Sequence, residues 1–189
     1  MEYISKNQLS LLLPVIINKI INLSPKDNRP AFFRSSLLDN IGALVSPCDY
    51  IIDNIYLGSC TAASDIELLR SFNIKYICNI SDNIPNFFEN KIKYFNISKK
   101  DNGKDDINKY ELEESFKFIK KSKEENCNIL VHCFVGRSRS VSVLIYYLMK
   151  EYDFSIKESI YFLKKKRKWI NPSIKFIENI INIVNEING

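Results

Sequence analysis

The stretch NILVHCFVGRSRSVSVLIYYLM, residues 128–149, decides which fold the chain can adopt. It opens with an apolar run typical of a buried strand and closes with apolar residues at helical spacing. Cys133 stands at the carboxyl end of the predicted strand, and Arg139 follows six residues later. The segment therefore predicts a strand, a short loop and a helix, with the loop leading directly into the amino-terminal end of the helix.

The predicted loop is suited to holding an anion. Successive backbone N–H groups can converge on phosphate oxygens, and the helix dipole adds a favourable potential. Gly136 permits the tight backbone path, and the guanidinium of Arg139 can bind two oxygens at once. The candidate phosphate-binding residues are Phe134, Val135, Gly136, Arg137, Ser138 and Arg139.

Cys133 is the candidate nucleophile. A free thiol has a pKa of about 8.5, and N–H dipoles together with a nearby arginine lower it. The resulting thiolate can attack phosphorus in line and form a phosphocysteine, which water then hydrolyses. No metal or other cofactor is expected, because the backbone amides and Arg139 can neutralise the charge that metal ions neutralise in metal-dependent phosphatases.

Two neighbours of these residues need separate interpretation. His132, the single histidine of the chain, immediately precedes Cys133. Because neighbouring side chains of a strand point to opposite faces, we expect His132 to form hydrogen bonds behind the loop as a supporting residue and not to act as the general base. Arg137 is either a solvated surface arginine or a group that attracts a second phosphate or an acidic substrate segment.

The residues around this segment predict an α/β domain. Short β-branched or aromatic runs alternate with longer segments of helical period, which favours a central, mostly parallel twisted sheet of about five strands flanked by helices. Asp106 is the expected cap of the second helix, and Asn171 that of the last, with Pro172 at its first position. The predicted strands are 50–52, 54–57, 75–80, 92–96 and 128–132, and the predicted helices are 61–72, 107–123, 138–152, 155–168 and 172–188.

Residues 1–47 differ from the rest of the chain. The run LSLLLPVIINKIINL, residues 9–23, has apolar positions at helical spacing, and the turn-rich SPKDNRP follows it. We therefore expect an N-terminal extension at 1–47 and a catalytic domain at 48–189. The extension is either a helix packed on the domain or a docking segment for a partner.

Composition limits the classes of protein that fit. The chain has 189 residues, 46% of them hydrophobic and 26% charged, which is a globular balance for one domain. The net charge of +5 is spread along the sequence, so it suits an anionic substrate but does not indicate nucleic-acid binding. Five cysteines without a C-x-x-C pair suggest a reducing compartment, and no membrane span or secretory signal is apparent. The expected location is the cytoplasm, with the nucleus as an alternative.

Residues 132–140 resemble the HC-x-x-G-x-S-R-S signature of dual-specificity protein phosphatases, a branch of the cysteine-dependent protein tyrosine phosphatase superfamily. The likeness extends to IYLGSCTAASDIELLRSFNIKYICNIS at 55–81, to KKDNGKDDI at 99–107 and to YYLMKEYDFSIKESIYFLKKKRKWINPS at 146–173. The resemblance covers about 50–187 and implies a protein tyrosine phosphatase-like fold. The absence of a second, kinase-docking domain indicates a small, atypical member.

The resemblance also implies roles for further residues. Asp101 lies where the family has the aspartate that protonates the leaving oxygen, with Asp105 and Asp106 as competitors. Ser140 is expected to help the thiolate depart when the phosphocysteine is hydrolysed. The implied substrates are phosphoproteins carrying phosphotyrosine or phosphoserine/phosphothreonine. Cys78 is interpreted as a core residue, with a redox role beside Cys133 as the lesser alternative.

Two other functions remain open at this point. The same chemistry could act on a phosphoinositide or an RNA 5′-phosphate, although FVGRS lacks the extra lysines of the lipid enzymes and the second histidine of the RNA enzymes. The domain could also be a catalytically silent module that binds phosphoproteins. Such modules usually lose the cysteine or the arginine, and this chain has both.

Overall fold

The computed structural model of the chain describes residues 48–102 and 105–188. The predicted extension at 1–47 lies outside the described residues, so its helix, its docking role and the boundary at residue 48 stay predictions. Among the residues that are described, none of the helices is both long and apolar enough to cross a bilayer.

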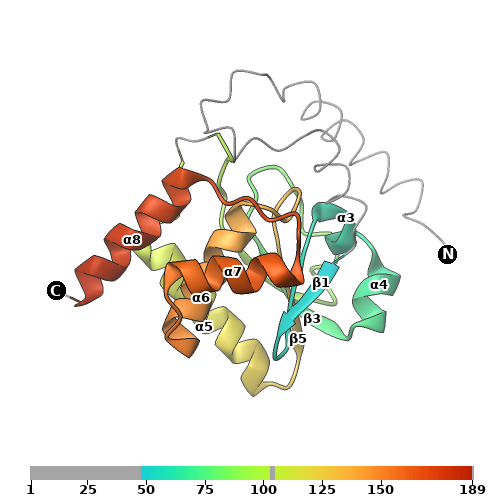
Figure 1. Cartoon of the computed structure of the whole chain (residues 1–189). Helices are drawn as coiled ribbons and strands as arrows, with labels where there is room; N and C mark the ends of the chain where they lie inside the picture. The colour runs from blue at the N-terminus through green and yellow to red at the C-terminus, as the bar shows by residue number, and fades with distance from the viewer. Residues whose placement is uncertain (1–47, 103–104, 189) are drawn as a thin grey trace.

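A five-stranded sheet forms the centre of the domain, in the order β1-β2-β5-β3-β4 (Figure 1). β1 pairs with β2 in the antiparallel sense, whereas β2, β5, β3 and β4 run parallel to one another. This arrangement confirms the predicted mostly parallel α/β sheet. The strands are β1 (Cys48–Ile52), β2 (Ile55–Gly58), β3 (Ile74–Asn79), β4 (Lys93–Asn96) and β5 (Asn128–His132).

Helices cover both faces of the sheet, and the residues of β5 pack against the helices on both sides. Ile129 and Val131 pack in the larger core with α5, α6, α7 and α8, whereas Leu130 packs in the smaller core with α3 and α4. Alternate residues of a strand face opposite sides, so an apolar run is what a doubly covered strand requires. The helices are α3 (Cys60–Ala63), α4 (Ile66–Ser71), α5 (Lys109–Glu124), α6 (Arg139–Tyr152), α7 (Ile156–Lys166) and α8 (Ile174–Asn188).

The parallel strands bring three loops to one edge of the sheet. His132 at the end of β5 pairs with Gly58 of β2 on one side and with Asn79 of β3 on the other. In sheets of this kind, ligands bind outside the carboxyl ends of the strands. The segment after His132 is therefore placed where a binding site is expected.

Three expected helix boundaries are wrong, each because a different polar group caps the helix. The predicted helix 61–72 is divided, because the Asp65 side chain accepts hydrogen bonds from Glu67 N and Leu68 N and starts a new helix there. The cap of α5 is not Asp106 but Asn108, which forms a reciprocal capping box with Glu111.

The last helix begins two residues later than Pro172. Asn171 does not cap it, because its backbone N–H donates to the carbonyl of Arg137 at 2.8 Å and holds the chain against the loop after β5. Instead the Ser173 hydroxyl accepts a hydrogen bond from Phe176 N at 3.4 Å. The helix therefore starts at Ile174.

Candidate active site

Residues 133–139, which we call the phosphate loop, connect β5 to α6, as the sequence predicts. Gly136 has a φ of 71°, and a Cβ atom there would lie 2.2 Å from the carbonyl oxygen of Gly58. The close approach and the left-handed backbone both require glycine. The predicted tight turn is therefore confirmed, and its physical reason includes a contact with β2 that the sequence alone did not indicate.

Arg167 supports the loop from behind. Its Nε donates to the carbonyl of Gly136 at 3.0 Å and its Nη2 to that of Val135 at 3.2 Å, while Nη1 pairs with Asp49 at 2.6 Å. The side chain is almost fully buried. Because these two carbonyls point toward Arg167, the loop is held in one backbone conformation, with Gly136 N directed at Cys133 Sγ.

Sequence reasoning missed Arg167, although its spacing carried a signal. Ser159, Leu163 and Arg167 recur every four residues, the spacing of one face of a helix, and all three are buried, although α7 itself ends at Lys166. In the run KKKRK at 164–168, Arg167 is the one residue on that inward face. A buried arginine within an otherwise exposed basic run indicates a structural partner.

Cys133 lies at the base of the loop with its side chain buried. Its Sγ accepts hydrogen bonds from Gly136 N and from Ser140 Oγ, both at 3.3 Å. Burial by itself raises the pKa of this thiol, but the positive charge of Arg139 and the hydrogen bonds from Ser140 outweigh it. The net result lowers the pKa of Cys133 from 9.0 to about 7. A substantial fraction of thiolate is therefore present at neutral pH.

His132 is buried behind Cys133, where the sequence placed it. Its Nδ1 lies 3.1 Å from the Cys133 carbonyl, an acceptor, so Nδ1 carries the proton. Burial lowers the pKa of His132 to about 4, because desolvation and the Arg139 charge disfavour a second proton and outweigh the hydrogen bond to Cys133. A neutral imidazole fixed to the loop backbone fits the expected supporting role.

Arg139 is fixed by the loops beside it. Its Nη1 donates to the carbonyl of Lys99 at 2.7 Å and to Ser81 Oγ at 3.5 Å. The carboxylates of Asp82 and Asp101 lie 3.7 and 3.9 Å from its guanidinium nitrogens. Arg139 Nε is buried and has no hydrogen-bond partner among the described residues. One donor of the guanidinium is therefore available for an oxygen of a bound anion.

Of the three competing aspartates, Asp101 is the one that lies beside the phosphate loop. Asp101 Oδ1 accepts a hydrogen bond from Ser138 Oγ at 3.3 Å. Asp105 instead accepts from Lys100 N and Asn102 Nδ2, both at 3.0 Å, inside its own loop. Asp106 faces Lys175 at 3.9 Å.

The other predicted loop residues have distinct environments. Phe134 is buried, and its carbonyl accepts from Cys60 N, whereas Val135 is half-buried. Arg137 is 8% exposed, so its interpretation as a solvated surface arginine is wrong. Ser138 precedes α6 without capping it, because its hydroxyl contacts Asp101 and accepts from Ser173 N. The side chain that would usually cap the helix thus leaves the first-turn N–H groups facing the loop.

Two further features concern groups outside this cluster. Cys78 is buried in the sheet opposite Val131 and Phe95, and burial raises the pKa of its thiol far above the ordinary value. This is the environment of a core residue. Across residues 48–102 and 105–188, no group of three or more histidine, cysteine or acidic side chains is arranged to hold a metal ion.

The comparisons with known proteins agree with this geometry. The model of the family "Dual specificity phosphatase, catalytic domain" matches residues 55–186. Protein phosphatase Slingshot of Drosophila melanogaster is 34% identical over 150 residues, which are 79% of this chain and 14% of Slingshot. Dual specificity protein phosphatase 6 of Homo sapiens is 34% identical over 134 residues, 70% of this chain and 35% of that protein. The chain thus spans about a third of these relatives' length or less.

A solved structure has the same fold. Human DUSP28 matches with a TM-score of 0.69 and 21% identity, over 76% of this chain and 96% of that one. The resemblance drawn from the signature is confirmed by the family match, which covers well over half of the sequence. The chain belongs to the dual-specificity phosphatase catalytic-domain family.

Proposed function

We propose that this protein hydrolyses phosphate monoesters of proteins, on tyrosine and on serine or threonine, through a phosphocysteine intermediate. The observation that carries the proposal is the setting of Cys133 Sγ, which accepts two hydrogen bonds at the base of the phosphate loop beside the buried Arg139. The protein substrate class rests on membership of the family.

In the first chemical step, Cys133 is the nucleophile. Its thiolate attacks phosphorus, a P–S bond forms, and the P–O bond to the substrate side chain breaks. Asp101 gives a proton to the departing oxygen, which leaves as the hydroxyl of tyrosine, serine or threonine. The support for Asp101 is its position against Ser138 and within 3.9 Å of Arg139.

The phosphoryl oxygens stay bound throughout. The loop N–H groups and the guanidinium of Arg139 supply donors that are already oriented, so stabilising the transition state needs little reorganisation. Arg167 contributes by fixing the carbonyls of Val135 and Gly136. It is a positioning residue because its hydrogen bonds to the loop are to these backbone carbonyls.

In the second step, water attacks the phosphocysteine. The Asp101 carboxylate accepts a proton from this water, the P–S bond breaks, and inorganic phosphate leaves. The Ser140 hydroxyl, 3.3 Å from Cys133 Sγ, donates to the departing thiolate and stabilises it. Cys133 is thereby returned to its starting state.

The proposal is tested by metal-free hydrolysis of an aryl phosphate and of phosphotyrosine and phosphothreonine peptides. Wild type is compared with Cys133→Ser and with Cys127→Ser, a half-buried cysteine outside the loop. We expect turnover in wild type and Cys127→Ser, loss in Cys133→Ser, and a covalently phosphorylated wild-type protein after rapid acid quench.

Other results would point to the remaining candidates. Binding of phosphopeptides by wild type without turnover would identify a silent binding module. Turnover of a phosphoinositide or of an RNA 5′-phosphate, without turnover of phosphopeptides, would replace the protein substrate class while keeping the role of Cys133.

A further inference from the structure

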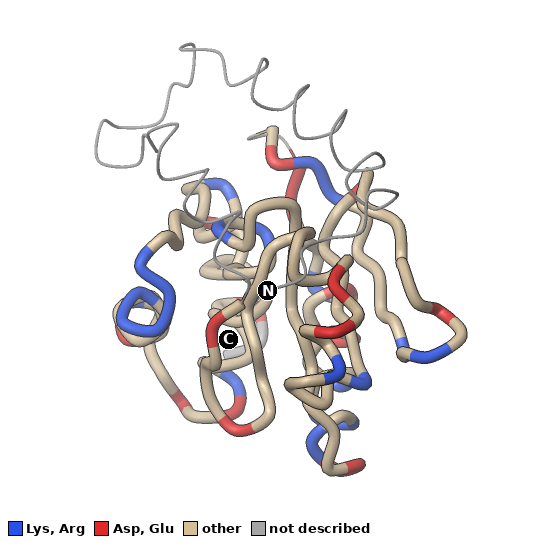
Figure 2. Tube along the Cα trace, turned by 90° about the vertical axis from the view of Figure 1, so that its right-hand side faces the viewer, with Lys and Arg blue, Asp and Glu red and all other residues tan. Residues whose placement is uncertain are grey.

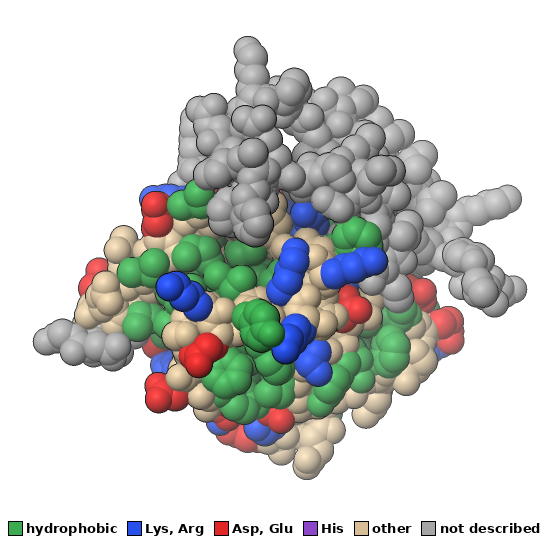
Figure 3. Space-filling view, viewed as in Figure 1, with side chains coloured by type: hydrophobic (Ala, Val, Ile, Leu, Met, Phe, Trp, Pro, Cys, Tyr) green, Lys and Arg blue, Asp and Glu red, His purple; other side chains and the backbone are tan. Residues whose placement is uncertain are grey.

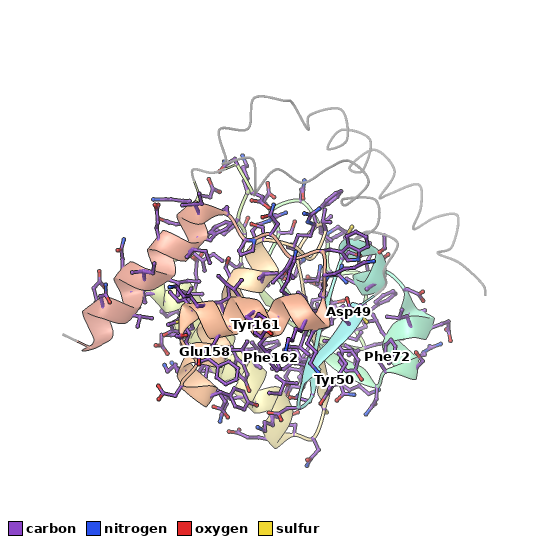
Figure 4. The ribbon with its side chains drawn as sticks, in the orientation of Figure 1. Asp49, Tyr50, Phe72, Glu158, Tyr161 and Phe162 are labelled. Atoms are coloured by element: carbon purple, nitrogen blue, oxygen red, sulfur yellow. The ribbon has the colours of Figure 1, made fainter. Side chains whose placement is uncertain are left out.

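One face of the domain carries lysines that stand over aromatic rings. It is formed by the carboxyl end of α7, the residues after it and β1 (Figure 4). The ammonium of Lys165 lies 4.4 Å from the Tyr161 ring, and that of Lys168 lies 4.3 Å from the Trp169 ring. We call this surface the lysine–aromatic face, and its members are Tyr50, Tyr161, Lys165, Lys166, Lys168 and Trp169.

Two of the three aromatic side chains of this face, those of Tyr161 and Tyr50, are exposed to solvent, whereas Trp169 is half-buried. Tyr161 is 63% exposed and Tyr50 49%, and these are among the few large hydrophobic side chains of the described residues that lie open to solvent. Lys166 lies 5.7 Å from the ring of Tyr50, so the cations of α7 extend over β1. Figure 3 shows basic and hydrophobic side chains intermingled at the centre of this face.

The described acidic side chains do not neutralise the positive charge of this face. Within the part of the chain that the structure describes, no carboxylate lies within 4.0 Å of Lys165, Lys166 or Lys168. The two nearby acids are already engaged, Asp49 with Arg167 and Glu158 with the cap of α7. In Figure 2 the end of α7 accordingly appears as an unbroken basic run.

Three lysines of α5 behave differently. Lys117, Lys120 and Lys123 of α5 each lie within 2.7 Å of a carboxylate. A cation over a neutral ring keeps its full net charge, whereas a cation in an ion pair does not. The lysine–aromatic face is therefore electrostatically suited to an anionic partner that also offers apolar contacts.

This face is continuous with the phosphate loop. The chain from Lys168 runs within three residues to Asn171, whose N–H donates to the carbonyl of Arg137. Two residues further, Ser173 N donates to Ser138 Oγ. Arg167, between the lysines, contacts the loop directly. A peptide with its phosphorylated residue in the loop therefore has a short route to Trp169 and the lysines.

We propose that the lysine–aromatic face binds an acidic segment of the protein substrate next to the phosphorylated residue, with the lysines contacting carboxylates or further phosphates and the rings contacting apolar side chains. This inference rests on the proposed phosphatase function and specifies its substrates. Continuity with the phosphate loop favours a substrate segment over an anionic membrane, which the exposed cations alone would fit equally well.

The test measures kcat/KM for two sets of phosphotyrosine peptides, with acidic or with neutral residues flanking the phosphotyrosine on either side. Wild type is compared with a triple variant, Lys165→Gln, Lys166→Gln and Lys168→Gln. A matched control removes three positive charges from α5, as Lys109→Gln, Lys117→Gln and Lys121→Gln. A separate assay measures hydrolysis of an aryl phosphate whose leaving group carries no charged substituent. This assay reports on the catalytic site alone.

We expect wild type to favour the acidic peptides about tenfold at low salt, since several exposed ion pairs each contribute modestly. The preference should shrink to about twofold in the triple variant, persist in the α5 control and weaken as salt increases. Aryl phosphate hydrolysis should be equal in all three proteins, because these lysines do not touch the phosphate loop.

An acidic preference that survives in the triple variant, or one that is lost equally in the α5 control, would overturn the inference. The inference would also be overturned if wild type, but not the triple variant, bound phosphatidylserine vesicles while both showed the same peptide preference. The face would then bind membranes. If wild type fails to hydrolyse even the aryl phosphate, the proposed function itself is wrong, and this result is distinct from all the others.

Discussion

The phosphate loop and the loop that carries Asp101 are built in opposite ways. The phosphate loop is buried and fixed by distant elements, among them Gly58 of β2 and Arg167 after α7. The segment before α5 is largely exposed, and Asp105 forms its hydrogen bonds with Lys100 and Asn102 of that same segment. The proposed phosphate-binding loop thus has a backbone held by the core, whereas Asp101, the proposed proton donor, is supplied from a surface loop.

Arg139 is the residue that joins the two loops, so changing it should have the largest effect. Lysine in its place cannot both donate to the Lys99 carbonyl and bind two phosphate oxygens. We expect Arg139→Lys to lower kcat/KM for an aryl phosphate on the order of 10³-fold, as for the loss of an oriented transition-state donor. Turnover near that of wild type would contradict the assignment of Arg139.

Asp101→Asn should have the next largest effect, on the order of 10²-fold on phosphotyrosine peptides, because a general acid is lost. The effect should be much smaller for an aryl phosphate with a strongly acidic leaving group, which needs no proton. Asp106→Asn is the matched control, since Asp106 faces Lys175, and it should change turnover less than about twofold. Equal effects of the two substitutions would remove the distinction between the aspartates.

Arg167→Gln tests whether the core contact matters for the phosphate loop. Loss of Arg167 leaves two buried carbonyls without their donor, so we expect the free energy of unfolding to fall by about 2–3 kcal/mol and kcat/KM to fall about tenfold. Asp49→Asn removes the ion pair but keeps the carbonyl contacts, and it should have a smaller effect on kcat/KM. Urea unfolding and steady-state kinetics measure both variants. An equal loss of kcat/KM in the two variants would show that the carbonyl contacts are unimportant for catalysis.

Ser140→Ala should produce the smallest change above neutral pH, and its effect should increase as the pH falls. Its hydroxyl helps to hold the pKa of Cys133 at about 7, so its removal should raise that pKa by about 1. The thiolate is the reactive form, and a raised pKa leaves less of it at low pH. Inactivation by iodoacetamide should therefore slow about tenfold at pH 6 and hardly at all at pH 9. Parallel pH profiles for the two proteins would show that the hydroxyl does not stabilise the thiolate.

The central sheet could be predicted because its signals are local. The apolar run before His132 and the helical spacing after Arg139 each depend on residues that are neighbours in sequence. The predicted helix caps were wrong where more than one side chain could cap the helix. Asp106 has a favourable residue type for a cap, but Asn108 can form the reciprocal contact with Glu111, and this decides where α5 begins.

The support of the loop lay beyond sequence reasoning, and residue type alone did not separate the three aspartates, although the family resemblance pointed to Asp101. Asp101, Asp105 and Asp106 are equivalent as residue types, and they differ in what the folded chain places beside them. Arg167 is 34 residues after Cys133, and its partner Asp49 is 118 residues away from it. Pairings across such separations depend on how the helices and strands pack, which no local pattern encodes.

The sequence by itself determined the sheet and helix pattern and the placement of Cys133 and Arg139 on one short loop, because hydrophobic period and residue spacing act within a few residues. The tertiary structure alone decided what holds the loop carbonyls and why Gly136 must approach β2, and it placed Asp101, the aspartate that the resemblance favoured, beside the loop. These depend on side chains from separate elements converging at one edge of the sheet, where burial and charge lower the pKa of Cys133 to about 7.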